Sequence, residues 1–107
     1  MDNEYVKDKI KRFLDDEGRL KAYPAKHKQK VFALYYLASK FTYGVHYTEK
    51  EINQILKAWH SFDDWVMLRR DLYDFCFLGR EPNGSVYWLR DEAPTFATFG
   101  LDEDVRV

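Results

Sequence analysis

The dipeptide Asn83-Gly84 limits the fold more than any other feature, because it predicts a tight β-turn in a chain whose other patterns are helical. Asparagine and glycine accept the positive φ angles of hairpin turns, and Pro82 fixes one further backbone angle. Residues 78–81 and 85–89 flank this turn and are expected to form two strands. A β-hairpin near the end of the chain therefore excludes an all-helical bundle.

Helical periodicity precedes this hairpin. Apolar residues recur at every third or fourth position in four segments, which we expect to be helices: Glu4 to a stop at Gly18, Lys26 or His27 to Phe41, Thr48 to His60, and Asp63 to about Phe77. The start of the third helix is the best marked, because Thr48 and Glu51 match the reciprocal capping box. Ser61 or Asp63 is expected to cap the fourth helix.

Two short extended pieces complete the expected fold, one at 19–23 and one within 43–47. From Lys26 onward the order is helix, short strand, helix, helix, hairpin, which is the winged-helix order. We therefore expect an α+β, winged-helix-like fold, with a three-helix core, a β-hairpin wing, and an extra N-terminal helix and short strand. A single domain would span residues 1–107, with its core at about 26–89 and an acidic, aromatic tail at 90–107.

Composition places the chain among globular proteins, because 46% of its 107 residues are hydrophobic and 18% are aromatic. The longest apolar run, Val31 to Ala38, is shorter than the roughly 20 residues of a membrane-spanning helix. The first residues lack the apolar region of a signal peptide. We therefore expect a cytoplasmic protein with no membrane partner. Cys76 is the only cysteine, which excludes an intrachain disulfide, and it is expected to be a packed thiol.

Charge is unevenly distributed, although the net charge is only −1. Residues 1–30 hold nine Lys or Arg against six Asp or Glu. Within them, the basic segment (residues 19–30) carries five cations and no carboxylate: Arg19, Lys21, Lys26, Lys28 and Lys30. It leads into a helix N-terminus, whose free N–H groups also attract anions. We therefore expect these cations to contact nucleic-acid phosphates, with Arg70 and Arg80 as additions; the alternative is a solvated lysine run.

The outward face of the fourth helix is expected to carry Asp63, Val66, Met67, Arg70, Tyr73 and Asp74. Two carboxylates against one guanidinium suit a DNA major groove poorly, because duplex binding depends on neutralising phosphates. Val66, Met67 and Tyr73 instead suit a protein partner or a homodimer, together with Phe96 and Phe99 of the tail. The alternative is that these side chains rest against the hairpin or the tail.

Residues that carry catalysis or hold metals form no recognisable pattern. His27, His46 and His60 lie far apart, and no cysteine or carboxylate stands near them at metal-ligand spacing. A glycine-rich phosphate loop and a nucleophile elbow are also absent from the sequence. We therefore expect no metal, no cofactor and no enzymatic activity.

Several short blocks between about Ile10 and Leu89 form a recognisable set: Arg-Phe-Leu-Asp-Asp-Glu-Gly-Arg-Leu-Lys at 12–21, Tyr23-Pro24, Lys28 and Lys30, Tyr36-Leu37-Ala38, Tyr-Thr-Glu-Lys-Glu-Ile-Asn at 47–53, Leu-Arg-Arg-Asp-Leu at 68–72, and Phe-Leu-Gly-Arg at 77–80. The resemblance is to a bacterial family of domains of unknown function, found alone and fused behind ArsR-type helix-turn-helix regulators. It implies a winged-helix-like fold in a transcription-related regulatory setting, and it assigns no catalytic residue. We expect the stand-alone form of this domain.

Two functions follow from these observations. The first is a regulatory domain that contacts nucleic acid weakly through the basic segment. The second is a protein-interaction or dimerisation module with no direct nucleic-acid binding.

Overall fold

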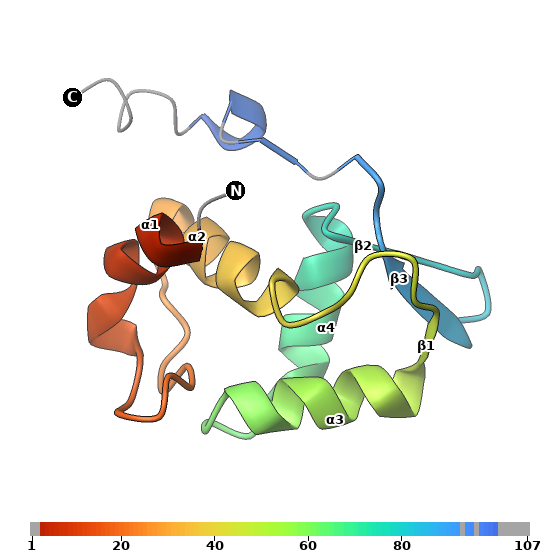
Figure 1. Cartoon of the computed structure of the whole chain (residues 1–107), viewed down its shortest axis with the longest axis horizontal. Helices are drawn as coiled ribbons and strands as arrows, with labels where there is room; N and C mark the ends of the chain where they lie inside the picture. Colours follow the sequence, from red (N-terminus) through yellow and green to blue (C-terminus); the bar gives the residue numbers. More distant parts are fainter. Residues whose placement is uncertain (1–2, 93, 96, 101–107) are drawn as a thin grey trace.

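The computed structural model describes residues 3–92, 94–95 and 97–100, which form an α+β fold (Figure 1). Within this part of the chain, four α-helices and two short 3₁₀ helices accompany one antiparallel sheet of three strands. The elements in chain order are α1 (Asn3–Lys9), η1 (Lys11–Phe13), α2 (His27–Ala38), β1 (Tyr47–Thr48), α3 (Glu49–Trp59), α4 (Trp65–Asp74), β2 (Leu78–Arg80), β3 (Val86–Leu89) and η2 (Ala97–Phe99).

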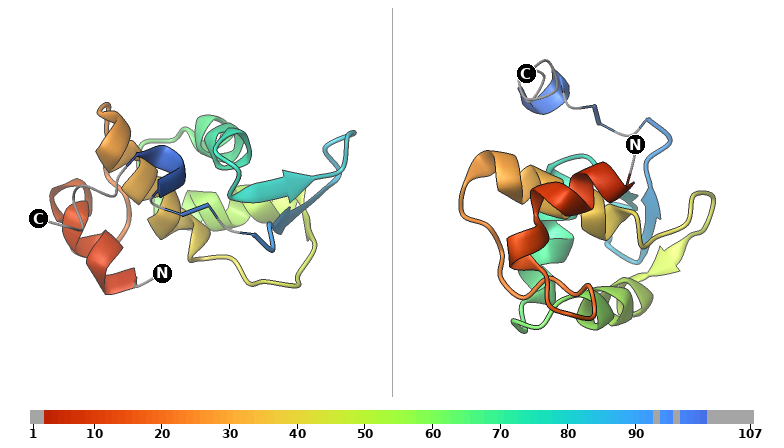
Figure 2. Two further views of the ribbon diagram at one scale, coloured as in Figure 1. Left: turned by 90° about the horizontal axis from the view of Figure 1, so that it is seen from above. Right: turned by 60° about the vertical axis from the view of Figure 1, so that its left-hand side comes forward.

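Helix α2 forms the centre of the hydrophobic core. All seven residues from Val31 to Leu37 are buried, as expected for a helix that is apolar on every side. Helix α1 packs along α2, α4 contacts α2 from another side, and α3 packs against α4. The sheet lies beyond α4, so that α1 and the hairpin occupy opposite ends of the molecule (Figure 2).

The hairpin is confirmed, and it forms the sheet together with one short strand. Strand β2 pairs with β3 in the register Leu78↔Leu89 and Arg80↔Tyr87. Gly84 has a φ of 74°, which is the left-handed conformation that this turn requires. The short strand expected within 43–47 begins later, as β1, and pairs with β3, so the sheet order is β1-β3-β2.

The α3 start is confirmed, whereas α4 starts one residue later than expected. Glu51 donates its backbone N–H to Thr48 Oγ1 at 3.1 Å, and Thr48 N–H donates to Glu51 Oε1 at 2.8 Å. At α4 the cap is Asp64, whose carboxylate accepts from Met67 N–H at 3.2 Å. The expected caps Ser61 and Asp63 are wrong, because Asp63 has a φ of 59° and turns the chain before the helix begins.

Three further expectations need correction. The first helix ends at Lys9 and continues only as a 3₁₀ turn. The strand at 19–23 is reduced to isolated β-bridges at Leu20, which pairs with Leu14 and with His60 but does not extend into a ladder. The second helix ends at Ala38 rather than Phe41, where the chain turns at Ser39 and Lys40.

Cys76 is exposed and not a packed thiol. Helix α4 ends at Asp74, and Cys76 takes a φ of 68° in the turn that follows. The positive φ breaks the helical spacing that would have placed this residue with the buried Leu68 and Leu72. The helix therefore stops before Phe77, which is buried through the turn instead.

The described part of the tail returns to the core. Tyr35 donates its hydroxyl to the carbonyl of buried Pro94 at 2.5 Å. The Phe99 ring stacks on Phe77 with centroids 5.9 Å apart and lies 5.8 Å from the Phe75 ring. Phe96 lies outside the described residues. No helix in the described ranges has the length and apolar character needed to cross a membrane.

Candidate functional site

The basic segment lies in the loop before α2 and in the first turn of α2. Lys21, Lys26 and Lys28 are exposed. Lys26 is the N-cap of α2 but offers no side-chain acceptor, and no acidic residue occupies the first turn. Helices α3 and α4, in contrast, are capped by side-chain oxygens of Thr48 and Asp64. The α2 N-terminus therefore combines positive side chains with backbone N–H groups that no side chain caps.

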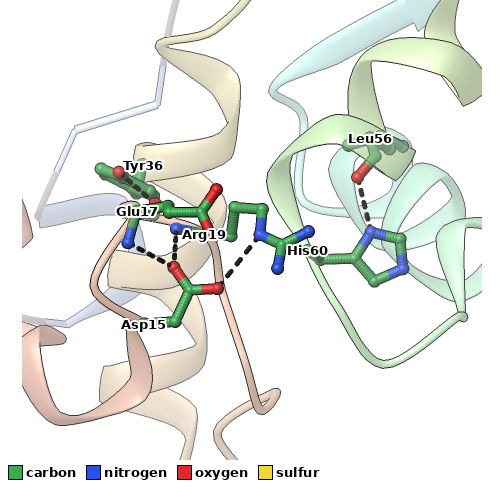
Figure 3. A network of polar contacts seen from close by, with 7 residues as sticks. Asp15, Glu17, Arg19, Tyr36, Leu56 and His60 are labelled. Carbon is green, nitrogen blue, oxygen red and sulfur yellow. Dashed lines mark hydrogen bonds and ion pairs between the residues drawn. The ribbon is translucent and has the colours of Figure 1, made fainter.

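Arg19 is engaged within the protein. Its Nε donates to Asp15 Oδ2 at 3.0 Å, while the backbone N–H groups of Arg19 and Glu17 both donate to Asp15 Oδ1 at 2.9 Å (Figure 3). The backbone hydrogen bond from Arg19 is the main cause that lowers the pKa of Asp15. Tyr36 holds the same turn by donating its hydroxyl to the Gly18 carbonyl at 2.6 Å. Arg19 thus closes a loop rather than facing a ligand.

Lys30 is also engaged, because its ammonium lies 5.2 Å from the centre of the Tyr23 ring. The Tyr23 hydroxyl donates to Asp71 on α4 at 2.6 Å, and burial together with this carboxylate raises the pKa of Tyr23. Lys21, Lys26 and Lys28, the other three predicted cations, are exposed to solvent at one end of the molecule. The hairpin lies at the other end (Figure 1).

A groove of about 360 Å³ lies between α4 and the hairpin. Its walls bring together residues of four elements: Glu49, Val66, Arg69, Arg70, Tyr73, Asp74, Arg80 and Tyr87. We call this the α4–hairpin groove. It includes both arginines that the sequence suggested as additions, Arg70 and Arg80, but no residue of the basic segment. The predicted cations therefore form two separate surfaces.

Two of the three arginines in the groove have carboxylate partners. Arg69 donates to Asn53 Oδ1 at 2.5 Å and lies 3.5 Å from Glu49, which ties α4 to α3. Arg70 lies 3.8 Å from Asp74, and this pair is open to water, with the Arg70 side chain 80% exposed. The first pair is structural, whereas the second is a solvent-exposed contact of small energy.

Arg80 is held by aromatic residues. Its guanidinium lies 4.7 Å from the centre of the Tyr73 ring, and the nearby phenol groups of Tyr87 and Tyr73 raise the pKa of Arg80. Sequence analysis missed Tyr87, because its place beside Arg80 depends on the register Arg80↔Tyr87 between β2 and β3. Glu49 was missed too, since only the packing of α3 against α4 brings it to this groove.

The outward face of α4 is exposed, as the helical spacing predicts. Val66 is 52% exposed, Met67 36% and Tyr73 41%. Phe99, which was expected to join this face, is half-buried against Phe75 and Phe77. The candidate interaction surface is therefore restricted to α4 among the described residues.

The three histidines have separate positions. His60 is buried, and its Nδ1 donates to the Leu56 carbonyl at 2.5 Å (Figure 3). Its Nε2 accepts from Asp64 N–H at 2.9 Å. His27 contacts the Phe99 carbonyl at 3.4 Å, and the His46 ring lies 5.5 Å from the Trp88 ring. In the part of the chain that the structure describes, no group of three or more potential metal ligands occurs.

Comparison with known proteins gives one family match. The model of a family described as "Uncharacterized protein conserved in bacteria (DUF2087)" matches residues 19–89. The matched range begins in the basic segment and ends with β3, so it contains both candidate surfaces. Searches of curated proteins and of solved structures find no match.

Proposed function

The chain belongs to the bacterial DUF2087 family, and we propose that it is a winged-helix-like regulatory domain that binds nucleic acid weakly through phosphate contacts. The order α2-β1-α3-α4-β2-β3 and the sheet order β1-β3-β2 support the winged-helix arrangement. In this arrangement α4 takes the place of the recognition helix and the turn at 82–85 that of the wing.

The observation that carries the nucleic-acid proposal is the N-terminus of α2. Lys21, Lys26 and Lys28 are exposed beside it, and neither a side-chain cap nor an acidic first-turn residue competes for its N–H groups. Lysines and helix N-termini are common contacts to backbone phosphates, and these contacts are independent of base sequence. We therefore expect weak binding with little sequence preference.

Salt dependence tests this proposal. Binding of a short DNA duplex, followed by fluorescence anisotropy, should weaken steeply between about 50 mM and 200 mM salt, because each phosphate contact releases counterions. A Lys21→Gln/Lys26→Gln variant should reduce the magnitude of the slope of log K against log salt by roughly 0.9 for each lysine.

The matched control is Lys50→Gln/Lys57→Gln on α3, which removes the same net charge from exposed positions. The proposal predicts that this control keeps the salt slope of the unaltered chain. Absence of duplex binding at low salt contradicts the proposal, as does an equal loss of slope in both variants.

A second function is supported by the exposed apolar face of α4, which would pair two copies of the chain. Val66, Met67 and Tyr73 expose apolar surface on one side of a single helix. Sedimentation over a range of concentrations should then show a dimer that Met67→Glu converts to a monomer. A monomer at every concentration contradicts self-association.

A further inference from the structure

We infer that the α4–hairpin groove is a second anion site, which binds a phosphoryl group through Arg70 and Arg80. This site does not rest on the proposed role of the α2 N-terminus, because the residues that line the groove come from α3, α4 and the hairpin and not from the basic segment. The phosphoryl group would be a nucleic-acid phosphodiester or the phosphomonoester of a small molecule.

The balance of charge in the groove favours an anion. Arg69 faces Glu49 and Arg70 faces Asp74, so these four charges cancel in pairs. Arg80 has no carboxylate partner in the described part of the chain; it contacts two neutral phenols, Tyr73 and Tyr87. The groove therefore carries one unmatched positive charge among its lining residues.

Hydrogen-bond donors converge on the same space. Tyr73 and Tyr87 line the groove together with Arg80, and each phenolic O–H can donate a hydrogen bond to an anion. Arg70 lies on the adjacent face of α4, and its exposed pair with Asp74 is readily exchanged for a stronger charged partner. Two guanidinium groups and two hydroxyls match the several acceptor oxygens of a phosphoryl group.

The placement of Arg80 and the size of the groove also suit a phosphoryl ligand. The Tyr73 ring packs against the Arg80 guanidinium before any ligand arrives, which reduces the ordering cost of binding. The groove volume of about 360 Å³ lies in the range of small-molecule sites, roughly 300 to 1,000 Å³, and leaves room for a sugar next to the phosphate.

Nuclear magnetic resonance titration of the full chain tests this inference, with inorganic phosphate and a short DNA duplex as separate probes and acetate as the control anion. Phosphate should shift the side-chain signals of Arg70 and Arg80. The variant Arg70→Gln/Arg80→Gln should lower the phosphate affinity by about tenfold or more, as expected for loss of charged hydrogen bonds. Lys50→Gln/Lys57→Gln on α3, which removes the same charge from exposed positions outside both surfaces, should leave it unchanged.

The two sources of phosphate give different results. A phosphodiester ligand predicts that the duplex shifts the same arginine signals, whereas a phosphomonoester predicts that only the small anion does. The two proposals can also be tested independently. If Lys21→Gln/Lys26→Gln loses duplex binding but keeps the response of the groove arginines to phosphate, the two surfaces bind separately.

Three outcomes would overturn the groove site: no shift with phosphate, an equal shift with acetate, or full affinity in the double variant. Because Arg80 contacts Tyr73 and Tyr87, its removal could loosen the hairpin. Arg80→Lys serves as the second variant, since it keeps the charge and loses the planar fork, and it too should bind phosphate more weakly. Arg70→Gln alone should also weaken binding without touching the hairpin.

Discussion

The basic segment and the α4–hairpin groove both present cations to solvent, but they hold them differently. In the basic segment the exposed cations are lysines on a loop and on the first turn of α2. In the groove the unmatched cation is Arg80, which packs over the Tyr73 ring and stands opposite Tyr87 in the hairpin. Mobile lysines favour salt-dependent attraction to any polyanion, whereas a fixed guanidinium favours one geometry of an oxyanion.

The difference teaches that cation density along a sequence is a poor guide to where charge is organised in space. Five cations lie within residues 19–30, yet Arg19 binds Asp15 and Lys30 covers Tyr23. The groove draws its arginines from two separate elements, and no run of basic residues marks it. The following predictions break one surface at a time.

Leu20→Ala should have the largest effect, because Leu20 is fully buried and anchors the basic segment between Leu14 and His60. We expect the free energy of unfolding to fall by about 2 to 5 kcal/mol, measured by urea denaturation. Below the unfolding transition, the phosphate response at Arg80 should persist while duplex binding weakens. Lys21→Ala, at an exposed neighbour, should change stability by no more than about 0.5 kcal/mol.

Gly79→Ala should disturb the hairpin side of the α4–hairpin groove. A Cβ atom at this position would lie 2.6 Å from Trp88 Nε1, so the indole that covers Gly79 must move. A loss of about 2 kcal/mol in thermal unfolding is expected, together with weaker phosphate binding at the groove. Adding Trp88→Leu should restore part of the stability; additive losses would show that the Gly79–Trp88 contact is not the cause.

Tyr23→Phe tests the link between the two regions, because the Tyr23 hydroxyl joins the basic segment to Asp71 of α4. Removing it should cost about 1.5 kcal/mol, since a hydrogen bond to a carboxylate is lost in a partly buried site. Hydrogen exchange should then increase at residues 19–26 but not in the hairpin. Equal exchange in both regions would mean that α4 transmits the change to the groove.

Asp15→Asn should have the smallest effect and should alter the pH dependence of stability. The pKa of Asp15 is lowered in the folded protein, so the ionised carboxylate stabilises the fold above its unfolded pKa of about 3.9. This contribution is lost as the pH falls through the lowered folded pKa. The variant should therefore show a flatter acid limb in thermal unfolding, whereas the control Asp16→Asn should keep it; identical acid limbs would contradict the assignment.

Local signals account for the features that could be predicted. Thr48 and Glu51 form their capping box within four residues, and Asn83-Gly84 sets its turn without help from distant parts of the chain. The cap of α4 was misplaced by one residue, because Asp63 and Asp64 are equivalent as capping residues and only the backbone angle at Asp63 separates them. The prediction that Cys76 is buried was wrong for a similar reason, because the positive φ of Cys76 interrupts the helical spacing.

The groove could not be predicted, because its geometry depends on tertiary register. Tyr73 reaches Arg80 only after α4 packs beside β2, and Tyr87 reaches it only through the pairing of β2 with β3. The partners of the basic segment were hidden in a similar way, since Tyr23 meets Asp71 across 48 positions of sequence. The sequence shows at which positions the cations stand. It does not show which of them have carboxylate or aromatic partners in the fold.

The contact of Phe99 with Phe75 and Phe77 joins the tail to residues inside the range that the family model matches. The family match stops at residue 89, ten positions before this ring. A protein shortened to the matched range would expose to water the faces of Phe75 and Phe77 that Phe99 covers, and it would tend to aggregate. Anyone trimming or fusing this domain should therefore choose the end of the chain by its packing and not by its homology.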